Sequence, residues 1–300
     1  MQDKFASLPS FSGQRSNEDN VASNKAGHCT AACVYQAKIA GYCRNVTVIW
    51  SKTMINHSVS ITVENYSSEN PCTCKIDLKP WPFWSKKGLK SLDVDGRRVD
   101  VYWDLRSAKF TGGSEPTSDY YVALVCDEEV SLLMGDYKKE AYKRTKARPS
   151  LVDATMVSKR ENVFGKKCFS TRAKFEERHR EHDIVVENSL TGPKDPEMWI
   201  SIDGLVLIHI TNLQWKFRGN ETIMVNKSPV QVFWDVHNWL FCSPGSGHAL
   251  FIFKPGVPDF WSDEDGAGDD EESESSRYYS VKSCGQGPQF CLFLYAWKVE

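Results

Sequence analysis

Two stretches of the chain, 131 residues apart, are similar enough to indicate how the whole chain is organised. Aligned without a gap, residues 84–105 and 215–236 share seven of 22 residues, where roughly one or two identities are expected by chance. We therefore predict an internal duplication, in which each copy has about the same succession of strands. The identical pairs include Trp84/Trp215, Trp103/Trp234 and Asp104/Asp235.

The matched residues predict structural roles. Trp and Val at strand spacing usually pack inside a sheet, so we expect the matched Trp residues to fill equivalent core positions. Each matched Asp follows a Trp, and we expect it to tie a turn rather than to carry chemistry. A second match, between residues 61–65 and 184–188, has a shift of 123, which places an eight-residue insertion before Trp215.

Most apolar residues recur at every second position and are β-branched or aromatic, which is typical of half-buried strands. Residues 46–50, 59–63 and 99–103 show this pattern, and Asp95-Gly96 predicts a tight hairpin turn. The short spacing between these segments favours antiparallel hairpins. One segment is predicted to be helical, with Asp136 as the cap of residues 137–145.

These patterns predict a mainly β protein with two tandem antiparallel units of seven to eight strands each and one short helix between them. A sheet of that size buries its apolar face by closing into a barrel or by folding over as a sandwich. Short hairpins in sequence order favour an up-and-down barrel. Residues 106–119 are long enough to cross over, which keeps a Greek-key sandwich open.

Two stretches of the chain carry a strong local charge of opposite sign. Residues 136–180 hold 14 Lys/Arg and 6 Asp/Glu, a local charge of +8, whereas residues 259–300 hold 3 and 10, a local charge of −7. The acidic stretch has few apolar residues, so we expect it to be disordered. The predicted segments are a disordered tail (1–28), a first β unit (29–135), a basic helix and linker (136–150), a second β unit (151–258), an acidic loop (259–288) and a closing strand (289–300).

Composition excludes several classes of protein. The formal net charge is −2, from 37 basic and 39 acidic residues, so no global charge favours nucleic acid or an anionic membrane. No apolar run is long enough to span a bilayer, and residues 1–20 have no secretory pattern. We therefore expect a cytoplasmic protein, with the nucleus as a second compartment. The ten cysteines lack zinc spacing, so we expect structural thiols and no metal or cofactor.

Several long motifs resemble a known family. They include residues 101–110, 120–125, 135–142, 195–204, 213–219 and 233–236. Together they resemble the plant-specific family catalogued as domain of unknown function 868, from about Cys33 to Trp297. The resemblance implies a plant protein and supplies no activity, ligand or catalytic residue.

We find no catalytic constellation and expect no enzyme activity. Gly245-Ser246-Gly247 lacks the strand-turn-helix context of a nucleophile elbow, and the chain has no phosphate-binding loop. His179 and His182 are interpreted as ordinary surface histidines.

The preferred function is a protein-interaction module with unidentified protein partners. Its candidate surface comprises Lys138, Lys139, Lys143, Arg144, Lys146 and Arg148, and its candidate phosphorylation sites are Ser262, Ser273 and Ser275. Phosphorylation of the acidic loop would strengthen its contact with the basic segment. The alternative is a carrier of an apolar or amphipathic small molecule inside a duplicated barrel. Weak nucleic-acid binding through residues 136–180 ranks third, because a basic run on a helix is usually its solvated face.

Overall fold

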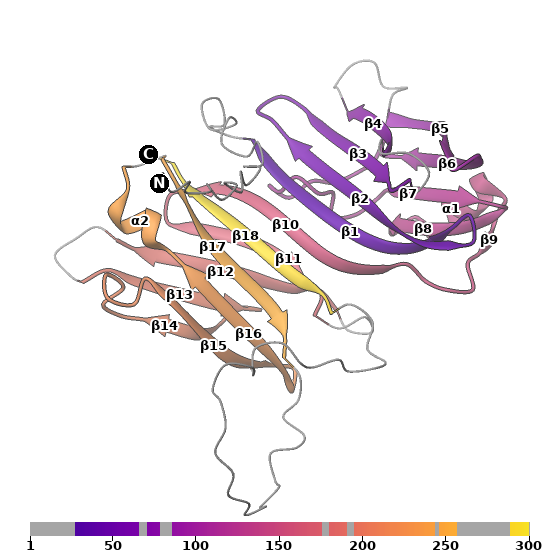
Figure 1. Ribbon diagram of the computed structural model, residues 1–300. Helices are drawn as coiled ribbons and strands as arrows, with labels where there is room; N and C mark the ends of the chain where they lie inside the picture. Colours follow the sequence, from indigo (N-terminus) through magenta and orange to yellow (C-terminus); the bar gives the residue numbers. More distant parts are fainter. Residues whose placement is uncertain are drawn as a thin grey trace, which may run out of the picture.

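The computed structural model describes residues 28–65, 71–78, 86–175, 180–190, 195–243, 246–256 and 289–299, and within them the protein is mainly β (Figure 1). The predicted tail up to residue 27, the acidic loop, Trp84 and the three candidate phosphorylation sites lie outside the described residues. In the described part, neither helix has the length and hydropathy needed to cross a membrane.

A nine-stranded sheet runs through both halves of the chain, with β18, β10 and β1 side by side at its middle (Figure 1). All neighbours in it are antiparallel except β18 and β10, which are parallel. In the order of the sheet, the strands are β15 (Arg218–Val225), β16 (Ser228–Asp235), β17 (His248–Pro255), β18 (Cys291–Lys298), β10 (Thr155–Gly165), β1 (Cys29–Ile39), β2 (Tyr42–Lys52), β3 (His57–Val63) and β4 (Cys72–Leu78).

Two smaller sheets form the second layer. The five-stranded sheet consists of β5 (Lys87–Val94), β6 (Arg97–Asp104), β7 (Tyr121–Cys126), β8 (Glu129–Gly135) and β9 (Arg148–Pro149). The four-stranded sheet consists of β11 (Cys168–Ala173), β12 (His182–Ser189), β13 (Glu197–Ile202) and β14 (Leu205–Ile210).

Each smaller sheet packs on one half of the long sheet and encloses a separate core. The first core includes Ile61 of β3 and Leu124 of β7, and the second includes Phe251 of β17 and Ile200 of β13, all fully buried. Alternate side chains along each strand point into these cores, as period-two patterning requires. The described residues thus form two sandwiches that share one continuous sheet.

The predicted up-and-down barrel is wrong for the described strands. All three sheets are open, with two edge strands each. Because the layers bury their apolar faces against one another, no sheet has to close on itself. A further feature was not predicted: β1 and β10, the first strands of the two predicted units, pair antiparallel from Thr30↔Asn162 to Gln36↔Thr155.

The two sequence-matched hairpins, β5–β6 and β15–β16, have the same register. Gly88 lies opposite Trp103, and Gly219 lies opposite Trp234. In both hairpins the indole ring occupies the space that a Cβ on the glycine would need. Both turns have two residues with positive φ, the geometry that matches the twist of paired strands. These residues are Asp95, Gly96, Asn226 and Lys227.

Helix α1 (Lys138–Thr145) lies where one helix was predicted, but its start differs. Tyr137 occupies the N-cap position, and the Asp136 carboxylate instead accepts the Tyr120 backbone N–H at 3.1 Å. Helix α2 (His237–Phe241) was not predicted, because five residues carry no readable period. It is anchored by Trp239, whose indole N–H donates to the Ala296 carbonyl at 2.9 Å.

Candidate functional site

Two charged side chains occupy inward positions in the middle strand of the long sheet. On β10 these are Lys159 and Glu161, with only 7% and 8% of their surface exposed. Their neighbours on β18, Leu292 and Leu294, are fully buried apolar residues. Buried charges are costly unless they are paired and hydrogen-bonded, so this pair requires an explanation.

The border between the two sandwiches explains their position. The five-stranded sheet packs on β1–β4, and the four-stranded sheet packs on β15–β18. β10 lies between these two halves of the long sheet. The five-stranded sheet and the four-stranded sheet therefore meet near Lys159 and Glu161. Polar groups occupy the space between the two sheets at this point.

Lys159 is the centre of a compact ion cluster. Its Nζ lies 2.6 Å from Glu115 Oε2 and 2.6 Å from Glu161 Oε1, and it donates to the Arg172 carbonyl at 3.0 Å. Three acceptors therefore match the three ammonium hydrogens. Glu115 comes from the connection between β6 and β7, and its Oε1 also accepts the Cys33 thiol at 3.4 Å. The cluster thus links both sandwiches.

Burial and pairing determine the protonation states of the cluster. Burial is the largest influence on Glu161 and raises its pKa, although Lys159 opposes this. Burial alone would lower the pKa of Lys159, but Glu161 and Glu115 outweigh it and raise that pKa, so the amine stays an ammonium. Burial also raises the pKa of Cys33 well above its ordinary value, which keeps the thiol protonated.

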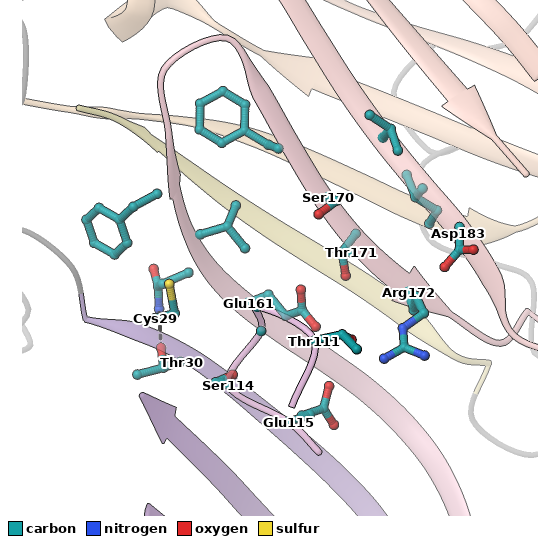
Figure 2. A pocket seen from close by; sticks show the side chains of 18 of the residues that line it. Cys29, Thr30, Thr111, Ser114, Glu115, Glu161, Ser170, Thr171, Arg172 and Asp183 are labelled. Atoms are coloured by element: carbon teal, nitrogen blue, oxygen red, sulfur yellow. Dashed lines mark hydrogen bonds between the residues drawn. The ribbon is translucent and has the colours of Figure 1, made fainter. Parts of the chain in front are cut away.

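A cavity of about 590 Å³ lies beside this cluster, and we call it the junction cavity (Figure 2). Its wall is formed by the starts of β1 and β12, residues 111–115, β10 and β11. Many wall residues besides the cluster carry polar side chains. These are Thr30, Thr111, Ser114, Asn162, Ser170, Thr171, Arg172 and Asp183.

Thr171 has a buried hydroxyl that lacks a hydrogen bond. The residue is 7% exposed, and its Oγ1 has no partner within hydrogen-bond geometry among the described residues. In Figure 2 this hydroxyl points toward the Glu161 carboxyl group, which also lines the cavity. A weak hydrogen bond from Thr171 lowers the pKa of Glu161 and opposes the effect of burial, although the two groups fall outside full hydrogen-bond geometry. Buried hydroxyls are rarely left in this state in native proteins.

Sequence reasoning did not single out Glu115, Lys159 or Glu161. The readable signal was in β10, where Lys159 and Glu161 stand two residues apart and so share one face of a strand. Glu115 gave no signal, because only the fold brings its connection to β10.

The predicted basic segment lies on α1 and the residues after it. All six of its Lys and Arg residues are exposed. Arg148 pairs with Glu129 at 2.8 Å. Helix α1 packs on its neighbours through Ala141, which is fully buried beside Tyr121 of β7. None of the six basic residues lines the junction cavity.

The matched Trp residues have different environments. Trp234 is 9% exposed and belongs to the second core, and Trp103 is half-buried against the first. Trp215 is 82% exposed, so its predicted core position is wrong. It stands in the connection after β14, outside both sheets of its sandwich.

The matched Asp residues make similar local contacts. Asp104 Oδ1 accepts the backbone N–H of Arg106 at 3.4 Å, and Asp235 Oδ1 accepts that of His237 at 3.0 Å. Each carboxylate also pairs with an arginine, Arg106 at 2.8 Å and Arg218 at 2.8 Å respectively.

His182 was predicted to be a surface residue, and this is wrong. It is 3% exposed, and its Nδ1 lies 2.8 Å from Asp203 Oδ2, while the Asn226 amide lies 3.4 Å from its Nε2. His182 therefore joins the β13–β14 turn to the β15–β16 turn, as a hydrogen-bonded structural histidine.

A second feature lies on the solvent side of the long sheet. Apolar side chains follow one another across β16, β17, β18 and β10 on the face opposite the second core. Phe293 also lies under the Arg160 guanidinium, 5.3 Å from ring to charge. We call this the outer aromatic face, and it comprises Phe164, Phe233, Leu250, Ile252, Phe293, Tyr295 and Trp297.

Comparison with known proteins gives a family and no function. The family model described as "Plant protein of unknown function (DUF868)" matches residues 26–298. Neither the curated proteins nor the solved structures compared with this chain gave a match.

Proposed function

The chain belongs to the plant protein family of unknown function DUF868, and we propose that it is a non-enzymatic binding protein that holds a small polar molecule in the junction cavity. The observation that carries this proposal is the buried Thr171 hydroxyl, which faces the cavity without a hydrogen-bond partner among the described residues. A ligand with a polar group would supply that partner. The cavity of about 590 Å³ falls within the roughly 300–1,000 Å³ of typical ligand pockets.

The lining of the cavity favours a polar ligand over an apolar one. The carrier hypothesis required the interior of a closed barrel, and the described sheets are open. An apolar molecule in the junction cavity would desolvate charged side chains of the wall, such as Glu115, Arg172 and Asp183, without offering them a hydrogen bond, which is costly.

The protonation states of the cluster support a binding role rather than a catalytic one. A nucleophilic cysteine needs a thiolate, but burial raises the Cys33 pKa. A basic lysine needs a free amine, but Lys159 is held as an ammonium by two carboxylates.

Native mass spectrometry on the full chain, purified gently from plant tissue, tests this proposal. We expect a discrete extra mass that is lost on denaturation. Ser170 is exposed and lines the cavity, so Ser170→Trp fills the cavity without disturbing a core and should abolish the extra mass. Thr222→Trp, at an exposed position on β15, is the control and should retain it. A wild-type chain without extra mass, or a Ser170→Trp chain that keeps it, contradicts the proposal.

The outer aromatic face favours a second function, a protein-interaction module. Contiguous exposed apolar patches on soluble proteins commonly mark interaction sites. Phe233 is 36% exposed, and its neighbours across the sheet, Ile252 and then Phe293, are half-buried. A photo-crosslinking residue at Phe233 should capture one defined protein, and Phe293→Ser should prevent capture. Leu205→Ser, which changes an exposed apolar residue on β14, should not. Equal loss in both variants contradicts this role.

We also propose that the two halves arose by duplication, each with two successive four-stranded meanders. The strand orders β1-β2-β3-β4 and β5-β6-β7-β8 parallel the orders β11-β12-β13-β14 and β15-β16-β17-β18. The shared Gly–Trp register of β5–β6 and β15–β16 supports the same conclusion. The two halves differ in which of their meanders belongs to the long sheet.

A further inference from the structure

The charges around the junction cavity do not balance. Three carboxylates line it, from Glu115, Glu161 and Asp183, against two cations, Lys159 and Arg172. The Arg172 guanidinium is 40% exposed and lies 3.8 Å from a further carboxylate, that of Glu181. With all three carboxyl groups ionised, the wall carries one net negative charge, and its most buried carboxylate, Glu161, shares its cation with Glu115.

The arrangement of acceptors shows where a positive group would fit. Lys159 occupies Oε1 of Glu161 and Oε2 of Glu115, and the Cys33 thiol occupies Oε1 of Glu115. A carboxylate has about four lone-pair sites, so Glu161 retains acceptor capacity. The Thr171 oxygen, without a partner among the described residues, faces this carboxyl group (Figure 2).

We propose that the ligand of the junction cavity is a small organic amine, whose ammonium group donates to Glu161 and Thr171. This inference rests on the proposed function and specifies its ligand class. An ammonium carries the charge that the wall lacks, and its several N–H donors match the clustered acceptors. The neutral polar residues of the wall, such as Ser114 and Ser170, bind the rest of the molecule.

Two other classes of ligand fit less well. A bare divalent ion needs six or more oxygen ligands of its own. Here Lys159 Nζ already lies 2.6 Å from the carboxylates of both Glu115 and Glu161, and it repels a dication. An anion would add to the negative excess of the wall and would offer no donor to the remaining lone pairs of Glu161.

Isothermal titration calorimetry at pH 7.5 with paired probes tests the inference. The pairs are putrescine with 1,4-butanediol and glucosamine with glucose, and succinate and calcium chloride are added as single probes. We expect at least one amine to bind tenfold or more tighter than its neutral counterpart. Glu161→Gln should remove that preference, and Thr171→Val should weaken amine binding several-fold.

Two further variants keep the test decisive. Asp183 is exposed, so Asp183→Asn should fold even where Glu161→Gln does not, and it should weaken amine binding. Glu221→Gln, at an exposed position on β15 outside the cavity wall, is the control and should leave binding unchanged. Equal binding of amines and neutral probes, tighter binding of succinate or calcium, or no binding by any amine overturns the inference. The mass that the tissue-purified chain carries decides the proposed function separately.

Discussion

Lys159 is a buried cation whose three donors all have acceptors in the protein. It is buried beside the apolar side chain of Leu292 on β18, and it compensates two carboxylates at once. Replacing a whole buried ion cluster by apolar or neutral groups is often tolerated, but removing one member leaves a buried charge without its partner. Stability should therefore respond differently to single and to combined substitutions.

Lys159→Met is expected to destabilise the protein by about 3–5 kcal/mol, because Glu115 and Glu161 lose their shared cation. The triple variant Lys159→Met, Glu115→Gln, Glu161→Gln should recover much of that loss. Urea unfolding followed by circular dichroism measures both. A triple variant no more stable than the single one would show that packing, rather than charge, dominates at this position.

Asp203 gives the protein a pH-dependent contribution to stability. Burial alone would raise its pKa, but bonds from His182, the Asp183 N–H and Arg180 outweigh burial and lower it from 3.8. A carboxyl whose folded-state pKa is depressed stabilises the fold above its unfolded-state pKa, and this stabilisation is lost as pH falls through the folded-state value.

Asp203→Asn should therefore lower the urea midpoint of the protein at pH 7. The gap between variant and wild type should narrow as the pH is lowered below the ordinary Asp value of 3.8. Asp183→Asn is the control, because its carboxylate is exposed. A gap that stays constant with pH would mean that Asp203 acts only through the shape of its turn.

The pH dependence of amine binding follows from Glu161, whose folded-state pKa is raised by burial. The charged groups facing it are Lys159 and Glu115. A proton and an ammonium compete for the same carboxylate, so affinity should fall as pH is lowered through the folded-state pKa of Glu161. Titration with the binding amine at pH 7.5 and pH 5 measures this, and affinity that is equal at both values would place the ammonium elsewhere.

Among the elements, the matched hairpins show how much of a fold a sequence can predict. Asp95-Gly96 predicted a turn because a two-residue hairpin needs two positive φ angles, and both residues have them. The Gly–Trp pairs also follow from the repeat. Trp215 is exposed, although the repeat predicted a core position for it. Sequence identity within a repeat does not specify the environment of a residue just outside the paired strands.

Other elements left no local signal. Helix α2 is too short for a period, and its stability comes from the burial of Trp239, which is a tertiary contact. The pairing of β10 with β1 also could not be predicted from the sequence, because antiparallel pairing requires no particular residue in either strand. The junction cavity depends on that pairing, so the sequence could not predict the cavity either.

Gly219→Ala should destabilise the β15–β16 hairpin, because the new Cβ would collide with the ring of Trp234. Overpacking of this kind costs about 1–3 kcal/mol. Gly88→Ala should cost a similar amount against Trp103. Gly113→Ala is the control, since no atom lies within 4 Å of its Cβ position. Thermal unfolding compares the three variants, and an unaffected Gly219→Ala chain would mean that the indole moves freely.

At the scale of the whole molecule, the shared sheet joins two cores that would otherwise be independent. Seven residue pairs between β1 and β10 cross the border. The ion pair of Glu115 with Lys159 crosses it as well. Because of these contacts, unfolding of one sandwich also removes interactions that stabilise the other.

We therefore expect one cooperative unfolding transition, despite two separate cores. Native-state hydrogen exchange should give the same global free energy for amides in β2 and in β17, one strand from each sandwich. Glu115→Ala should lower both values together. Two transitions with separate midpoints would show that the sandwiches unfold independently.

The parallel pairing of β18 with β10 has a consequence for synthesis on the ribosome. β10 ends at Gly165 and β18 begins at Cys291, so well over a hundred residues must be translated before the last strand of the long sheet can enter. At typical rates of about 5–20 residues per second, that interval lasts several seconds or more. Until then, β1 already covers one edge of β10, while its other edge offers unpaired backbone groups to any extended chain nearby. We therefore expect a nascent chain at this stage to bind chaperones that recognise extended segments.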